Sequence, residues 1–331
     1  MALNKVNAYE ALIEELCSLK DESILILTHV KPDGDASGSA MAMAEMLAER
    51  GCSPVIYLDD NYEGSVEYFQ NKDFLVDQLV SSYDVIICLD CAIDKRLGLP
   101  KGTTLQDIEA VKVINIDHHV SNPEYGTTNL IDDQSSATCE MLTQLFRLKD
   151  VKVNLSCANN LLLGVMTDTG CYKFNNATSE TFDCTGWLLE KGAEKSILVE
   201  KVYQSTPLKV MQVQSWAISN MVVLENIKLA YIKVTDDVLE NYDVRVEDLD
   251  SLVDVVREIE GIELVCRLSP DGDNVRFSLR STNEERPILP LAKLIGGGGH
   301  QLACGATMEN TSIADAETKF LGYVKEVFGA W

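Results

Sequence analysis

The sequence contains no apolar run of the about 18–20 residues that a membrane-spanning helix needs. Its N-terminal segment predicts an amphipathic helix and has neither the apolar core nor the cleavage site of a secretory signal. Repeats and low-complexity tracts are also missing, which excludes collagen, coiled-coil and wholly disordered chains. The 331 residues are 46% hydrophobic and 24% charged, an ordinary composition for a globular protein of about two domains. We therefore expect a cytoplasmic protein that does not bind membranes.

Basic residues are scarce. Lys and Arg number 28 against 52 Asp and Glu, and the formal net charge is −24. Such a surface repels anionic membranes and long nucleic acid, including long duplexes, which are usually bound by basic stripes. A polyanionic substrate must therefore meet a local positive source such as arginine, a metal ion or a helix N-terminus.

The ten cysteines are not spaced as a disulfide framework. In a chain of this length without a secretory signal, they are interpreted as reduced thiols of a cytosolic protein. Cys88 and Cys91 form a C-x-x-C motif. No second cysteine pair or histidine lies at zinc-site spacing, so two thiols at a strand end are favoured over a zinc site.

Short β-branched runs alternate with helical patterns in the first half of the chain. The expected strands are residues 24–28, 55–58, 85–89 and 111–116, and the expected helices are residues 36–50, 136–148 and 155–166. Strands that are apolar throughout and separated by helices indicate a parallel sheet covered on both faces. We therefore predict a doubly wound, mainly parallel α/β domain over residues 1–190, with its ligands at the carboxyl ends of the strands.

The second half predicts a smaller mixed α/β domain over residues 208–331, joined by a helical linker or hinge over residues 191–207. The helical pattern that leads from the linker into this domain is expected to break at Pro207. Strands are expected at residues 227–234, 262–268 and 274–281, a helix at residues 247–259, and a glycine run follows at residues 296–299. In the last of these strands, Arg276 and Arg280 share the polar face, and a solvated role is favoured for Arg276.

Most groups that can bind metal follow the predicted strands of the first domain. They are His29, Asp33 and Asp35 after the first strand, Asp90 after the third, Asp117, His118 and His119 after the fourth, and Asp168 after a helix. Taken singly, each has a simpler interpretation, such as Asp35 as a helix cap. Parallel strands end at one edge, however, so five carboxylates and three imidazoles converge there. Their mutual repulsion predicts a bound cation.

The type of ligand narrows the choice of metal. Carboxylate and imidazole without thiolate fit Mn²⁺, with Mg²⁺, Co²⁺ and Fe²⁺ as alternatives. The carboxylates exceed the needs of one ion, so two ions are expected, and two-metal sites are typical of phosphoester hydrolysis. Ser135, Ser136 and Thr138 precede a predicted helix and are interpreted as capping hydroxyls.

Five motifs occur in a fixed order along the chain. They are H-x-x-x-D-x-D at residues 29–35, the lone Asp90, D-H-H at residues 117–119, Asp168, and G-G-G-H at residues 297–300. Together they resemble the DHH phosphoesterase superfamily, with its DHH-associated domain at the C-terminus. The segments HVKPDGDASGS and DHHVSN look most like the bifunctional oligoribonuclease/pAp phosphatase (nanoRNase) family. At Cys304 the family usually has a small residue such as alanine, and we expect little consequence.

The resemblance implies a role for each site residue. One ion would be held by His29 and Asp33, the other by Asp35, His118 and Asp168, and Asp90 would bridge both. His119 would face the scissile phosphate, and Asp117 would orient an imidazole. The substrate would be bound in the second domain by Arg280, Ser281, Gly297, Gly298, Gly299 and His300.

The resemblance also implies a reaction. The expected enzyme is a Mn²⁺-dependent phosphoesterase that cuts very short RNA to 5′-mononucleotides and 3′-phosphoadenosine 5′-phosphate (pAp) to AMP and phosphate. A phosphodiesterase of cyclic or linear dinucleotides, such as c-di-AMP or pApA, is the first alternative. A family-II inorganic pyrophosphatase and a nucleotide-binding regulator are the others. The sequence is also compatible with a homodimer.

Overall fold

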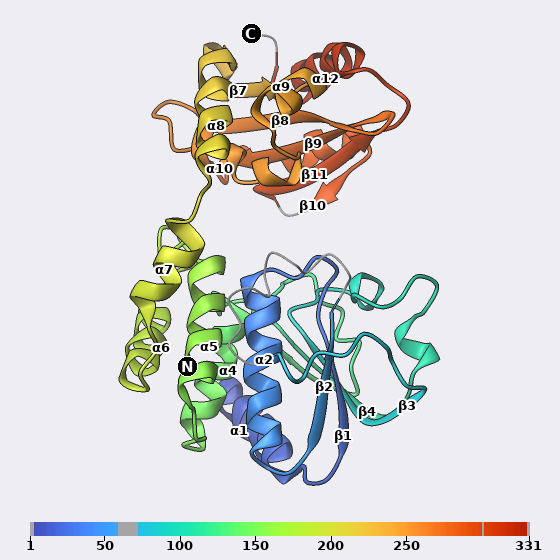
Figure 1. The fold of residues 1–331 in the computed structure, drawn as a ribbon, viewed down its shortest axis with the longest axis vertical. Coiled ribbons are helices and arrows are strands. Elements are labelled where there is room, and N and C mark those ends of the chain that lie inside the picture. Colours follow the sequence, from blue (N-terminus) through green and yellow to red (C-terminus); the bar gives the residue numbers. More distant parts are fainter. Residues whose placement is uncertain (1–2, 59–71, 300, 330–331) are drawn as a thin grey trace. The chain divides into compact units, whose positions relative to one another are not determined.

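The computed structural model describes residues 3–58, 72–299 and 301–329 (Figure 1). The chain divides into two compact units, Met1–Gln204 and Ser205–Trp331. This division falls inside the linker expected at residues 191–207. Each unit has its own sheet and its own buried core.

The first unit contains a five-stranded sheet in the order β2-β1-β3-β4-β5, and every neighbouring pair is parallel. The strands are β1 (Ser23–Leu27), β2 (Ser53–Tyr57), β3 (Ser82–Leu89), β4 (Glu109–Asp117) and β5 (Thr128–Ile131). The predicted parallel α/β sheet is therefore confirmed. The sequence pattern missed β5, a four-residue edge strand with two polar residues.

Both faces of this sheet are buried, which is why residues 24–27 of β1 and 85–89 of β3 are all apolar. Ile24, Ile26 and Ile87 share a core with the long helices, whereas Leu25 and Leu27 belong to a second core on the other face. The helices of the first core are α1 (Leu3–Ser18), α2 (Gly34–Ala48), α4 (Thr138–Leu148), α5 (Leu155–Asp168), α6 (Ser179–Glu190) and α7 (Lys195–Tyr203). In the described residues, the opposite face is covered by the region of the 3₁₀ turns η1 (Asp94–Arg96) and η2 (Leu105–Asp107).

The strand order creates a switch point. From β1 the chain first adds β2 on one side and then crosses to β3 on the other. In open α/β sheets, ligands bind at the carboxyl ends of the strands where the order reverses in this way. The ends of β1 and β3, together with the neighbouring β4, therefore define the edge at which a site is expected.

The second unit contains a six-stranded mixed sheet in the order β10-β11-β9-β8-β7-β6, in which only the pair β7–β8 is parallel. The strands are β6 (Val222–Leu224), β7 (Leu229–Lys233), β8 (Leu264–Asp271), β9 (Asn274–Ser281), β10 (Gly298–Gly299) and β11 (Ala303–Met308). One face packs against α11 (Leu289–Ile295) and α12 (Ile313–Phe328), and the other against α8 (Leu208–Asn220), α9 (Asp236–Tyr242) and α10 (Leu252–Val256). The predicted mixed domain is confirmed.

Two helix predictions of this region had different outcomes. The break at Pro207 is confirmed, because α7 ends before it and Pro207 is the N-cap residue of α8. The single helix expected at residues 247–259 is wrong. The chain instead forms a 3₁₀ turn, η4 (Glu247–Leu249), and the short α10.

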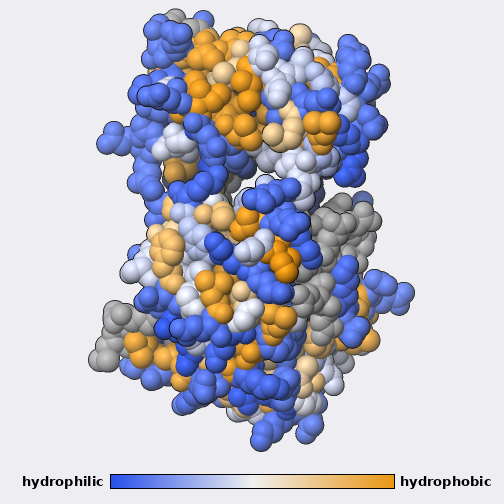
Figure 2. Space-filling view, turned by 60° about the vertical axis from the view of Figure 1, so that its left-hand side comes forward, coloured by the Kyte–Doolittle hydropathy of each residue, from blue (hydrophilic) through white to orange (hydrophobic). Residues whose placement is uncertain are grey.

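The surface follows the charge composition. Hydrophilic side chains cover much of the face shown in Figure 2, with smaller apolar patches between them. Among the described residues, no helix has both the length and the apolarity to cross a membrane.

Candidate active site

The loop between β1 and α2 supplies three of the predicted ligands. Asp33 is the N-cap residue of α2, and its carboxylate accepts hydrogen bonds from the backbone amides of Asp35 and Ala36 at 3.0 and 3.1 Å. Capping therefore does not account for Asp35. His29 Nδ1 lies 2.8 Å from the carbonyl oxygen of Val30, which can only accept, so Nδ1 carries the hydrogen. The lone pair of His29 Nε2 is then available to a metal ion.

Asp35 is fully buried in the first turn of α2. Its two oxygens accept hydrogen bonds from the backbone amides of Thr138 (2.7 Å) and Cys139 (2.8 Å), at the start of α4. The carboxylate fits there because position 164 of the facing helix α5 is glycine. A Cβ at Gly164 would lie 2.6 Å from Asp35 Oδ1.

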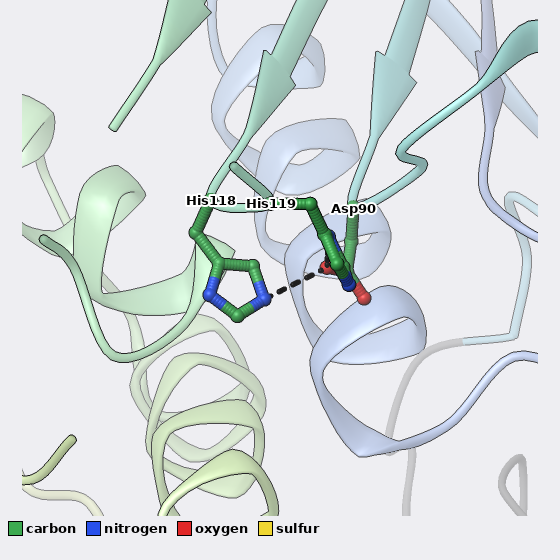
Figure 3. A group of neighbouring side chains, drawn as sticks. All are labelled: Asp90, His118 and His119. Atoms are coloured by element: carbon green, nitrogen blue, oxygen red, sulfur yellow. Dashed lines mark ion pairs between the residues drawn. The ribbon is translucent and has the colours of Figure 1, made fainter. Parts of the chain in front are cut away.

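Asp90 follows β3, and Figure 3 shows its side chain beside those of His118 and His119. Its side chain is buried. Oδ2 is 3.5 Å from His29 Nε2, and Oδ1 is 3.4 Å from His118 Nε2. One carboxylate therefore faces two imidazoles that come from different strand ends.

The end of β4 supplies the D-H-H residues. Asp117 is fully buried, and its carboxylate contacts His119 Nδ1 at 2.7 Å and Asn122 Nδ2 at 2.7 Å. His119 Nδ1 therefore donates to Asp117, which leaves His119 Nε2 as the nitrogen that can face a substrate. His118 points instead toward Asp168 at the end of α5, with 3.2 Å between Nε2 and Oδ2.

These side chains form three overlapping groups in the described part of the chain. Within each group, one ligand atom from every residue lies within 4.8 Å of the others. The groups are His29, Asp33 and Asp90; Asp35, His118 and Asp168; and Asp90, His118 and His119. The structure thus brings together all six residues predicted as ligands. Asp90 and His118 each belong to two groups.

The electrostatics of the site are those of crowded, buried acids. Burial, reinforced by the charge of Asp90, raises the pKa of Asp35 to about 7. Burial and the charge of Asp35 raise the pKa of Asp168 well above its ordinary value. Burial alone would also raise the pKa of Asp90, but hydrogen bonds from His118 and His29 lower it.

The imidazoles respond in the opposite sense. Burial disfavours the charged form of His29, but hydrogen bonds with Asp33 and Asp90 outweigh it and raise its pKa to about 11. A divalent cation among these groups would offset the repulsion between the carboxylates. The oxygen and nitrogen donors, with no thiolate in the three groups, fit Mn²⁺ or Mg²⁺.

The predicted substrate-binding residues lie in the second unit, where Arg280 and Ser281 end β9. Arg280 is half-buried, and its Nε lies 3.5 Å from Asp254 Oδ1. The hydroxyl of Ser281 is already engaged, because it contacts the carbonyl oxygens of Asn283 (3.1 Å) and Arg286 (2.8 Å). Ser281 thus stabilises the turn that follows β9.

The glycine run has a packing role at two of its three predicted positions. A Cβ at Gly297 would lie 2.2 Å from the carbonyl oxygen of Gly305. Gly299 has a φ of +138°, and a Cβ there would lie 2.5 Å from the carbonyl oxygen of Ala303. Gly298 alone faces open space. His300 lies outside the described residues.

Two neutral residues at the site were not predicted. Asn122, the last residue of the DHHVSN segment, donates to the Asp117 carboxylate through Nδ2. Thr138, like Ser135 and Ser136, was interpreted as a capping hydroxyl, and this was wrong. The N-cap residue of α4 is Ala137, without a side-chain hydrogen bond, and Thr138 Oγ1 contacts Asp90 Oδ1 at 3.3 Å.

Comparison with known families and proteins agrees with this geometry. The DHH family N-terminal domain matches residues 23–166, and the DHHA1 domain matches residues 226–330. Two relatives are named bifunctional oligoribonuclease and PAP phosphatase NrnA. The Bacillus subtilis protein is 28% identical, over 89% of this chain and 92% of its own length. The Thermus thermophilus protein is 29% identical, over 95% of this chain and 93% of its own length.

A solved structure shares the whole fold. The crystal structure of an exopolyphosphatase-related protein from Bacteroides fragilis superposes with a TM-score of 0.87 at 24% identity. The superposition covers 97% of this chain and 96% of that one. It therefore extends over both units.

Proposed function

From the premise that this chain belongs to the DHH family and is a hydrolase of phosphoester bonds, we propose that it degrades very short RNA and pAp. The products would be 5′-mononucleotides from RNA, and AMP and phosphate from pAp. The observation that carries the proposal is that the six side chains predicted as metal ligands lie in overlapping groups that share Asp90 and His118. The names of two relatives that match over nearly their full length support the substrate class.

The metal ligands are part of the proposal. His29 and Asp33 would hold one ion, and Asp35, His118 and Asp168 the other, with Asp90 shared. We propose Mn²⁺ as the metal, with Mg²⁺, Co²⁺ and Fe²⁺ as alternatives. When bound, such ions neutralise charge on the phosphoryl group as the reaction proceeds.

His119 is proposed as the group that meets the scissile phosphate. Asn122 fixes Asp117, and Asp117 fixes His119 through Nδ1. This chain of hydrogen bonds sets the ring orientation and the tautomer, as carboxylate partners of histidine commonly do. His119 Nε2 would then stabilise charge on the phosphate or protonate the leaving oxygen.

The second unit is proposed to hold the end of the substrate. Arg280 would bind a terminal phosphate, because its Nε is anchored by Asp254 and a guanidinium can present a second edge to an anion. Gly298 would offer exposed backbone to the same ligand, and His300 would assist. With a net charge of −24, the remaining surface disfavours a long RNA strand.

The proposal is tested by a chromatographic time course with Mn²⁺. A short RNA trimer, an RNA of about 24 nucleotides, pAp, pApA, c-di-AMP and pyrophosphate are offered separately. We expect fast loss of the trimer and pAp, with the long RNA nearly untouched. Preference for pApA or c-di-AMP would assign the enzyme to dinucleotides instead. Preference for pyrophosphate would overturn the nuclease assignment.

Two further proposals concern the setting of the reaction. We place it in the cytoplasm, because eight of the ten cysteines are buried thiols outside any disulfide, which suits a reducing compartment. A homodimer remains part of the proposal and is tested by light scattering on the purified protein. The partners are otherwise short RNA and small nucleotides.

A further inference from the structure

Thr138 lies where two carboxylates of the site meet. It is the first residue of α4 and is fully buried. Its backbone amide donates to Asp35 Oδ2 at 2.7 Å, and its hydroxyl lies 3.3 Å from Asp90 Oδ1, which as a carboxylate oxygen can only accept. One neutral residue therefore donates to two acids that come from different elements, α2 and the end of β3.

The geometry gives the side chain a task of its own. Any residue except proline at position 138 would keep the amide bond to Asp35, whereas the contact with Asp90 depends on the Thr138 hydroxyl. The backbone is held at this point, since the carbonyl of Ala137 accepts from the amides of Glu140 and Met141 at 3.1 and 3.2 Å. A β-branched side chain on a fixed helix start has few rotamers, which limits the directions that the Thr138 hydroxyl can take.

We infer that Thr138 is a positioning residue of the metal site, whose hydroxyl holds Asp90 in the orientation in which it can be shared between two cations. The inference rests on the proposed two-metal function and deepens it. It means that a neutral residue, Thr138, sets the spacing between the carboxylates of Asp35 and Asp90. Side chains that orient metal ligands in this way typically change metal affinity by about 10–100-fold when they are replaced.

The chain offers a matched control in the same helix. Thr143 is also fully buried in α4, but its hydroxyl bonds at 2.7 Å to the carbonyl oxygen of Cys139, one turn earlier. Thr143→Val therefore removes a buried hydroxyl without touching a site carboxylate. Thr138→Val removes the contact with Asp90 and leaves the side-chain shape nearly unchanged.

The experiment uses the full chain and three variants, Thr138→Val, Thr138→Ser and Thr143→Val. Mn²⁺ binding is measured by the electron paramagnetic resonance signal of free Mn²⁺ during titration, and pAp hydrolysis is measured in parallel. We expect Thr138→Val to weaken Mn²⁺ binding by about 10-fold or more. Thr138→Ser, which keeps the hydroxyl, and Thr143→Val should bind Mn²⁺ as the unmodified protein does.

The possible outcomes distinguish a failure of this inference from a failure of the proposed two-metal function on which it rests. Equal Mn²⁺ affinity of Thr138→Val and Thr143→Val, in a protein that binds Mn²⁺, overturns the role of Thr138 alone. Failure of the unmodified protein to bind Mn²⁺ overturns the metal site as well. If the valine variants unfold on purification, the pair Thr138→Ala and Thr143→Ala makes the same comparison, with thermal unfolding recorded for each.

Discussion

Replacement of Asp90 by asparagine tests the site at its centre. Asp90 is 2% exposed and belongs to two of the three overlapping ligand groups. It lies 3.5 Å from His29 Nε2 and 3.4 Å from His118 Nε2. Asparagine preserves the shape and one oxygen of the side chain, but removes the negative charge that two cations would share.

The size of the effect follows from the charge that is lost. Two unit charges about 4 Å apart interact by about 4 kcal/mol at an effective dielectric constant near 20. Since about 1.4 kcal/mol corresponds to a tenfold change in rate, one such interaction predicts a fall in kcat/KM of about 10³. A divalent ion carries twice the charge, so this value is a lower limit.

The assay is the chromatographic hydrolysis of pAp at a fixed Mn²⁺ concentration. Asp94→Asn is the control, because Asp94 lies in η1 shortly after Asp90 and its carboxylate contacts Gln106 at 3.4 Å. The control should retain the kcat/KM of the unmodified protein. A folded Asp90→Asn variant with kcat/KM within tenfold of that value would refute the shared role of Asp90.

Four further outcomes are expected. Chelation of divalent ions should abolish hydrolysis and lower the unfolding temperature measured by calorimetry, and Mn²⁺ should restore both, because a ligand stabilises the state that binds it. Asn122→Ala should lower kcat by about 10–100-fold with little change in KM, because Asp117, which orients His119, loses its hydrogen bond from Asn122. Steady-state kinetics on pAp check this. Arg280→Ala should raise KM for pAp more than it lowers kcat, and equal KM values would contradict a phosphate contact. Burial opposes the low pKa of Asp132, but Lys5 and other donors lower it. Its stabilisation is therefore present above its unfolded pKa of about 3.9 and lost as pH falls through the lower folded value. Asp132→Asn should destabilise the fold by about 1–3 kcal/mol at pH 7 and less at pH 3, as denaturant titrations would show.

Long, apolar strands could be predicted from the sequence because both faces of the sheet are buried. Both ends of β1, β3 and β4 lie within three residues of the expected bounds. The edge strands β5, β6 and β10 carry too few residues to give a pattern. Such short strands are fixed by pairing with a neighbour rather than by their own residues.

The helix expected at residues 247–259 shows a second limit. Its apolar spacing is helical, yet the carbonyl oxygen of Leu249 accepts from Arg267 Nη1, and the Asp250 carboxylate accepts from Nη2 at 2.9 Å. Arg267 is fully buried on β8 and needs these acceptors. A long-range partner therefore takes a carbonyl that a continuous helix would use, and no local pattern contains that information.

The candidate site divides in the same way. The charged residues could be predicted, because parallel strands deliver their following residues to one edge and acids gathered there need a cation. The contacts of Asn122 and Thr138 could not be predicted. A neutral donor bonds whichever acceptor the fold brings near it, and the sequence does not show where that acceptor lies. The glycine run was predicted as an anion cradle, but close approach to β11 accounts for Gly297 and Gly299.

The arrangement of helices explains how an acidic chain can present a site for an anionic substrate. The carboxylate of Asp33 caps the N-terminus of α2, and that of Asp35 accepts two amides at the N-terminus of α4. A helix N-terminus carries a partial positive charge that stabilises an anion by about 0.3–1 kcal/mol or more when partly buried. In the first unit, this partial positive charge stabilises the carboxylates of Asp33 and Asp35 and not a phosphate. The two amide hydrogen bonds favour the ionised form of Asp35, against the burial that raises its pKa. Asp33 and Asp35 would then attract the cations to which a phosphate binds. A substrate phosphate would therefore be recognised by the cations, and the cations by the carboxylates. This arrangement requires no stripe of basic residues along the surface.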